Sequence, residues 1–192
     1  MELNEREYQI IYKFRNEVKS CHITLSKCND VNVTAEIPET WINSIRLVLE
    51  KRFRVNEETK ETILDLSDFS SDPIFSEKRL RLGLHQTKVV TTVTDILTSA
   101  LTDITKLNIS NNKIIDISSW KPIFEKINIR SVDIRNNKIK KVNHFDCLKN
   151  NASVNDVNVV RNEFMKSLTR IDLEYKMKEI FPKLESLNGS KL

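Results

Sequence analysis

The sequence contains very little glycine, and its histidines are scattered. Only 2 of its 192 residues are glycine, so it cannot build the glycine-rich loop with which many nucleotide-binding proteins surround phosphate groups. His22, His85 and His144 lie far apart in the sequence, and no serine or cysteine occurs in a recognised nucleophile motif. We therefore predict that the chain is not an enzyme and that it uses no cofactor.

Cysteine is also scarce, and long apolar runs are absent. Cys21, Cys28 and Cys147 form an odd set without paired spacing, which is typical of a reducing intracellular compartment. Cys21, His22 and Cys28 resemble half of a zinc site, but no second ligand pair follows at ligand spacing, so we predict no metal. No stretch approaches the ~20 apolar residues of a membrane span, and the N-terminus lacks the apolar core of a signal peptide. We expect no membrane partner.

What the sequence does contain is a repeat. One pattern occurs three times, and every matched position recurs after 25 residues. Such spacing is typical of leucine-rich repeats, whose units are about 20 to 29 residues long. The three copies are Ile104-x-x-Leu107-x-Ile109-x-x-Asn112-x-Ile114, Ile129-x-x-Val132-x-Ile134-x-x-Asn137-x-Ile139 and Val154-x-x-Val157-x-Val159-x-x-Asn162-x-Phe164.

The spacing within each copy has a mechanical explanation. Leu107 and Ile109 alternate with polar Asn108, which predicts a short strand with one buried face. The chain must then turn, and its buried backbone groups would each cost roughly 1–3 kcal/mol if they had no partner. An asparagine side chain supplies both donors and an acceptor. We therefore expect a structural ladder of stacked asparagines at Asn112, Asn137 and Asn162.

The segments on either side of the repeats predict caps. A repeat stack has open apolar ends that must be covered. Pro38 is suited to a first helical turn, and the apolar spacing after it predicts an N-terminal cap helix over 38–54. Residues 63–66 read as a first, imperfect repeat strand, and the spacing over 89–101 predicts a helix on the convex side. A helix near 171–180 and a half-repeat ending at Gly189 form the predicted C-terminal cap, 168–192.

We therefore predict an α/β leucine-rich repeat solenoid, with short parallel strands on the concave face and helical caps. The repeat domain spans 35–192, and residues 1–34 form an N-terminal extension that is too small to bury a core alone.

Together, the caps and repeats resemble one family, the TAP-type nuclear RNA export factors, which are mRNA export receptors. The run Trp41-Ile42-Asn43-Ser44-Ile45-Arg46-Leu47-Val48-Leu49-Glu50-Lys51-Arg52-Phe53 is similar to the helix that precedes that family's repeats. Leu64-Asp65-Leu66 with Asp72-Pro73, Leu107-Asn108-Ile109-Ser110-Asn111-Asn112, and Phe181-Pro182-Lys183-Leu184 through Gly189 resemble its first repeat, second repeat and closing segment. The resemblance covers about residues 38–192.

This resemblance implies an RNA-binding module in the nucleus that also passes to the cytoplasm. It implies that residues 1–34 are the remnant of an RNA-recognition-type domain, although the aromatic stacking motif of that domain type is absent. In the family, heterodimer formation and contact with the nuclear pore belong to further domains that this sequence does not contain. We therefore expect a heterodimer partner only through such absent domains.

Positive charge is concentrated in the middle of the chain. Residues 101–150 carry 10 lysines and arginines against 5 acids, within a whole-chain net charge of +4. Most of the excess follows the strand of the middle copy, around Val132, at its turn edge. We name the candidate RNA-binding residues the basic rim: Lys113, Arg135, Lys138, Lys140, Lys141 and Arg161. We expect the basic rim to bind the backbone of single-stranded RNA, although such a charge run is also typical of a merely solvated surface.

A protein-interaction scaffold is the alternative, because concave repeat surfaces commonly bind partners. The outward strand positions predict the columns Lys106/Ser131/Asp156, Asn108/Asp133/Asn158 and Ser110/Arg135/Val160, which are polar and mixed in charge. Candidate protein-binding residues are Asp133, Val160 and Tyr175, for other nuclear proteins such as an RNA-processing or silencing complex. A third possibility is a structural spacer between flanking domains.

Overall fold

The computed structural model of the chain describes residues 9, 12–13, 15–16, 37–100 and 103–192. The unit predicted over 1–34, with Cys21 and Cys28, lies almost entirely outside these described residues. Within them, no helix has both the length and the apolar character needed to cross a membrane.

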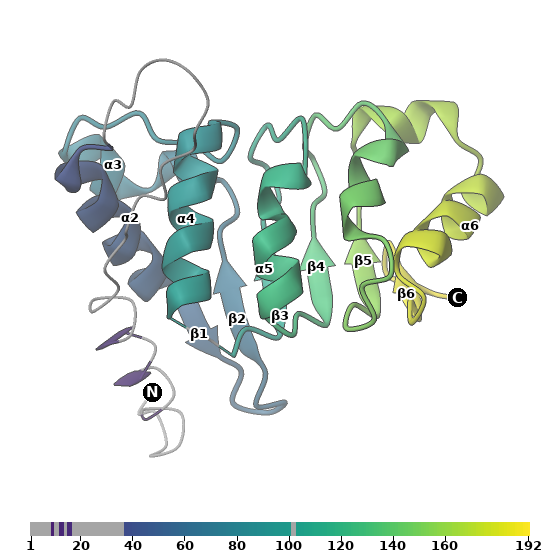
Figure 1. The fold of residues 1–192 in the computed structure, drawn as a ribbon, viewed down its shortest axis with the longest axis horizontal. Helices are drawn as coiled ribbons and strands as arrows, with labels where there is room; N and C mark the ends of the chain where they lie inside the picture. The colour runs from purple at the N-terminus through teal and green to yellow at the C-terminus, as the bar shows by residue number, and fades with distance from the viewer. Residues whose placement is uncertain (1–8, 10–11, 14, 17–36, 101–102) are drawn as a thin grey trace.

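One seven-stranded sheet follows the chain in sequence order (Figure 1). Its antiparallel end strands are β1 (Phe53–Val55), paired with β2, and β7 (Ser190–Lys191), paired with β6. The five strands between them pair in parallel: β2 (Thr62–Asp65), β3 (Lys106–Asn108), β4 (Ser131–Asp133), β5 (Asp156–Asn158) and β6 (Ser186–Leu187). This arrangement confirms the predicted α/β repeat solenoid.

The strand register follows the repeat period. Leu107 pairs with Val132, and Val132 pairs with Val157, so each strand aligns with the residue 25 positions later. These three side chains are buried, while their polar neighbours on each strand are half-buried. One exception to the predicted outward columns is Ser110, which is buried.

Helices cover one face of the sheet, with α4 and α5 lying in front of the strands in Figure 1. Helix α4 places Val93, Ile96 and Leu97 in the core. Its buried Thr92 and Thr98 donate their hydroxyls to helix carbonyls, so they leave no unmet hydrogen bond. Over the described residues from 37 onward, the α-helices are α2 (Glu39–Arg52), α3 (Pro73–Glu77), α4 (Thr87–Ser99), α5 (Lys121–Lys126) and α6 (Arg170–Ile180).

Helix α2 closes the N-terminal end of the stack through Ile45, Val48 and Leu49, which are fully buried. A buried ion pair attaches it to the first repeat: Arg52 Nε lies 2.9 Å from Asp72 Oδ2, and the Asp72 side chain is 2 % exposed. Asp72 also accepts a hydrogen bond from the Ile74 amide and so caps helix α3. The Asp-Pro pair therefore links the cap helix to the following turn.

The asparagines at the repeat turns are buried and bridge successive coils. The central member, Asn137, accepts hydrogen bonds from the amides of Asn112 and Ile114, both at 3.0 Å. Its Nδ2 donates to the Ile109 carbonyl at 3.0 Å and the Ile134 carbonyl at 2.9 Å. One side chain thus satisfies backbone groups in its own coil and in the preceding one.

The two neighbouring asparagines repeat this geometry. Asn112 Nδ2 donates to the Leu66 carbonyl at 2.8 Å, in the first repeat. Asn162 Nδ2 donates to the Ile134 carbonyl at 3.0 Å, and its Oδ1 accepts from the Ile139 amide at 3.2 Å. The turns of successive coils are therefore joined by direct hydrogen bonds.

The C-terminal end is closed by α6 and the β6–β7 hairpin. A capping box of Thr169 and Asp172 starts the helix. The hairpin turns at Asn188 and Gly189, both at positive φ (54° and 77°), which asparagine and glycine adopt most readily. Leu173, Met177 and Ile180 pack into the core.

Candidate functional site

The basic rim occupies the loops that follow the C-terminal ends of β3, β4 and β5. Lys113 and Lys138 are equivalent positions in successive coils, and the Lys138 amide donates to the Ile114 carbonyl at 2.8 Å. The asparagine ladder lies next to both lysines. The residues on either side of Lys113 donate their amides to Asn137, and Asn137 directly precedes Lys138. The backbone that carries these cations is thus held in place by buried hydrogen bonds.

Arg161 stands at a turn position that does not suit an arginine. Its φ is 62°, and the equivalent residues in the two preceding coils are Asn111 (φ 60°) and Asn136 (φ 54°). Asparagine tolerates this left-handed conformation better than arginine. Turn geometry by itself therefore does not explain the arginine.

The members of the basic rim differ in their charge partners. All six are exposed. Arg135 Nε lies 3.0 Å from Asp133 Oδ2, so its charge is balanced within its own coil. Among the residues that the structure describes, no ion pair involves Lys113, Lys138, Lys140, Lys141 or Arg161. These five side chains are available to an anionic ligand.

The concave face has the opposite character. Asp65 and Asp133 occupy the same register column on β2 and β4, and Asp156 lies in the adjacent column of β5. Burial raises the pKa of the Asp133 carboxyl; Arg135 opposes that rise, and the charges of Asp156 and Asp65 add to it. Lys106 on β3, in the same column as Asp156, is paired with Glu61 at 2.7 Å. The concave face is therefore a poor track for phosphates.

The three residues predicted to bind proteins fall in two places. Asp133 lies on β4, and the half-buried Val160 follows β5 at the edge of the concave face. Tyr175 lies on α6, outside the sheet, where 71 % of it is exposed. Its helical neighbour Ile171 is 78 % exposed. The structure thus separates Tyr175 from the other two candidates by element.

One further cation escaped the sequence analysis. Lys166 is exposed and stands one repeat after Lys141, at the same 25-residue spacing. With Arg161 it lines a hollow of about 370 Å³ at the end of the stack. Extending the repeat alignment into the last loop would have identified it.

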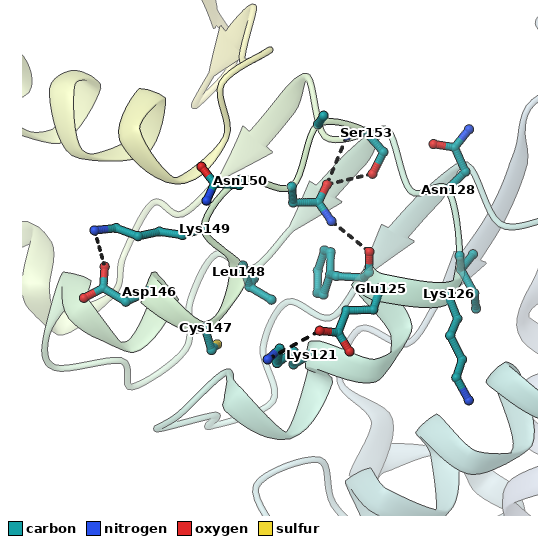
Figure 2. A pocket seen from close by; sticks show the side chains of 14 residues that line it. Lys121, Glu125, Lys126, Asn128, Asp146, Cys147, Leu148, Lys149, Asn150 and Ser153 are labelled. Atoms are coloured by element: carbon teal, nitrogen blue, oxygen red, sulfur yellow. Dashed lines mark hydrogen bonds and ion pairs between the residues drawn. The ribbon is translucent and has the colours of Figure 1, made fainter.

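A groove of about 670 Å³ lies on the helical side, between α5 and residues 146–153 (Figure 2). Two of its lysines are paired, Lys121 with Glu125 at 3.4 Å and Lys149 with Asp146 at 3.8 Å. Cys147 lines the groove, and burial raises the pKa of its thiol, which favours the unreactive protonated form. Over the described ranges, no three His, Cys, Asp or Glu side chains gather as metal ligands.

Comparisons with known proteins agree on the type of domain. The family model described as the NXF1/2/3/5 leucine-rich repeat domain matches residues 50–189. A solved structure of Chaetomium Mex67:Mtr2 subunits superposes with a TM-score of 0.60 at 18% identity, covering 77% of this chain and 90% of that one. The Mex67 leucine-rich repeat domain of Chaetomium thermophilum gives a TM-score of 0.53 at 18% identity, covering 79% and 93%. A comparison with curated protein sequences found no match.

Proposed function

This chain belongs to the family of the NXF1/2/3/5 leucine-rich repeat domain, and from that premise we propose that it binds single-stranded RNA and contributes to mRNA export from the nucleus. Family membership confirms the resemblance to nuclear RNA export factors. Binding occurs through the basic rim and without strong sequence preference. The same proposal includes a nuclear location with passage to the cytoplasm, and a division into an extension, 1–34, and a repeat domain, 35–192.

One observation carries the proposal. Lys138, Lys140 and Lys141 are exposed and have no carboxylate partner among the described residues, and the asparagine ladder holds the coils on either side at a fixed register. Unbalanced cations on a rigid edge suit the regularly spaced charges of a nucleic-acid backbone, whose phosphates carry no sequence information. The acidic concave face directs the RNA to the edge instead.

A salt series tests this proposal. Binding of the full chain to a fluorescent single-stranded RNA should weaken with salt, by about 0.7 in log affinity per log unit of salt for each phosphate neutralised. Replacing Lys138, Lys140 and Lys141 together with glutamate should abolish most of that dependence.

A matched control carries the same charge change elsewhere: Lys78→Glu, Arg81→Glu and Lys88→Glu, three exposed residues near the N-terminal end of the solenoid. The control should bind RNA nearly as well as the unaltered chain. Equal losses in both triple variants would mean that only net charge matters. Equal binding by the rim variant and the unaltered chain would mean that the rim is a solvated surface.

A second candidate function is a protein-interaction scaffold, and the row of carboxylates on the concave face favours it. Asp65, Asp133 and Asp156 complement a basic partner, such as a component of a nuclear RNA-processing or silencing complex. Asp133→Arg with Val160→Glu should then abolish a pull-down that survives ribonuclease. A pull-down that ribonuclease eliminates, or that the double variant retains, contradicts this function.

A further inference from the structure

Helix α6 carries a second apolar stripe that no described part of the chain covers. Its core face is formed by Leu173, Met177 and Ile180, all buried. Ile171, Tyr175 and Lys178 recur at i, i+4 and i+7 on the opposite face, and the first two are the most exposed large apolar side chains among the described residues. Burial of an aromatic ring is strongly favourable, so a ligand that covered the exposed ring and the neighbouring isoleucine would gain stability from both.

We propose that Tyr175 is a base-stacking platform for single-stranded RNA, so that bound RNA runs from the basic rim onto helix α6. This inference rests on the proposed RNA-binding function and adds the part that contacts bases. Ile171 supplies an apolar neighbour to the stacked base, and the Lys178 ammonium attracts the adjoining phosphate. Aromatic stacking combined with backbone cations is how proteins bind single strands without sequence preference.

The charges on α6 favour a nucleic acid as the occupant. Glu174 accepts from Arg170 at 2.8 Å. Glu179 lies 2.7 Å from Lys149 and 3.3 Å from Lys176, and hydrogen bonds from these two lysines hold the pKa of Glu179 below its usual value. Glu174 and Glu179 are therefore neutralised, while the third carboxylate of α6, Asp172, accepts hydrogen bonds from the Thr169 amide and hydroxyl in the capping box. Lys178 forms no ion pair with any residue that the structure describes, so the C-terminal end of the stripe carries an unpaired positive charge.

Two hollows that share Met165 lie between Arg161 of the basic rim and the first turns of α6. The hollow lined by Arg161 and Lys166 includes Met165. Met165 also lines a second hollow, of about 270 Å³, which reaches Arg170 and Glu174 on α6. The chain itself passes from Arg161 through a 3-10 helix, Glu163–Ser167, directly into α6. A strand bound along the basic rim thus meets the start of the cap helix.

Among the described residues, no phenylalanine, tyrosine or tryptophan ring other than that of Tyr175 is exposed near the basic rim, and the ring of half-buried His144 bonds through Nδ1 to the Ile115 carbonyl at 2.9 Å. Every phenylalanine that the structure describes is buried, and so is Trp120 of the second coil. Tyr12 and Tyr175 are the exposed aromatic residues among those described, and only Tyr175 follows the rim in the chain. When RNA is bound at the rim and one of its bases unstacks, Tyr175 is therefore the aromatic side chain on which that base stacks.

The experiment compares two probes on the full chain: a uridine oligonucleotide, and an abasic oligonucleotide of the same length with the same phosphates. Tyr175→Ser should weaken binding of the uridine probe roughly 5- to 150-fold, the range that corresponds to stacking of one base. Tyr175→Phe keeps the ring and should bind like the unaltered chain. Both variants should bind the abasic probe equally well and keep the same salt dependence.

Leu47→Ser removes another exposed apolar side chain, from α2, and should leave both affinities unchanged. One result overturns the stacking role: Tyr175→Ser binds the uridine probe as tightly as the unaltered chain, while the triple glutamate variant of the rim binds it more weakly. Tyr175 would then be a protein anchor. If the unaltered chain binds neither probe, both the stacking role and the proposed RNA-binding function are overturned. The two failures are therefore distinguishable.

Discussion

Replacing Asn137 with leucine tests whether the asparagine ladder holds the coils together. The substitution preserves approximate size but removes a side chain that is 5 % exposed and forms hydrogen bonds to two coils. The amides of Asn112 and Ile114 lose their acceptor, and the Ile109 carbonyl loses a donor. The Ile134 carbonyl keeps a donor, because Asn162 also bonds to it at 3.0 Å.

The expected loss of stability follows from these three backbone groups, which are left without hydrogen-bond partners. Each buried group without a partner costs about 1–3 kcal/mol, and the added apolar side chain returns about 1.5–3 kcal/mol. At the middle of these ranges the free energy of unfolding should fall by about 4 kcal/mol, a large share of the roughly 5–15 kcal/mol that stabilises a typical domain.

Urea denaturation followed by circular dichroism measures this loss. The control is Asn143→Leu, at an exposed asparagine in the same coil, which should shift the midpoint only slightly. Equal midpoints for Asn137→Leu and the unaltered chain would refute the argument that the asparagine satisfies otherwise stranded backbone groups. A change in slope without a change in midpoint would instead indicate an altered unfolded state.

Two further predictions concern carboxylates. Asp72→Ala leaves the Arg52 guanidinium without its buried partner and α3 without its cap, so urea denaturation should show a loss of about 3–5 kcal/mol. Burial raises the folded-state pKa of Asp133 above its ordinary value. The ionised carboxyl therefore lowers the stability of the folded chain at neutral pH. Below the pKa of Asp133 in the unfolded chain, the carboxyl is protonated in both states and this penalty disappears. Asp133→Asn should therefore raise the melting temperature at pH 7 and leave it unchanged near pH 3, and a larger gain at acid pH would contradict this linkage.

Much of the fold was predictable because it is encoded locally and repeated. A period of 25 residues places Leu107, Val132 and Val157 in one register column, because each coil must stack on the last with its apolar side inward. The positive φ of Gly189 also follows from local preference. Helix α5 was not predicted, since six residues are too few to show a helical period.

The candidate site was less predictable, because charge balance depends on neighbours in space. Arg135 and Lys138 belong to the same run of cations in the sequence. The structure pairs Arg135 with Asp133 and leaves Lys138 without an ion pair among the described residues. Composition identifies where positive charge accumulates, but only contact geometry shows which charges are already neutralised.

The sequence by itself determined the repeat, the register of its strands and the asparagine column, because these depend on periodicity and on hydrogen bonds to nearby backbone. Only the tertiary structure decided which face of α6 is buried. Its sequence carries two apolar stripes, one through Ile171 and Tyr175 and one through Leu173 and Met177, and both satisfy helical spacing. Packing against the last coil buries the second stripe. The first faces solvent because one side of a helix can contact one surface only.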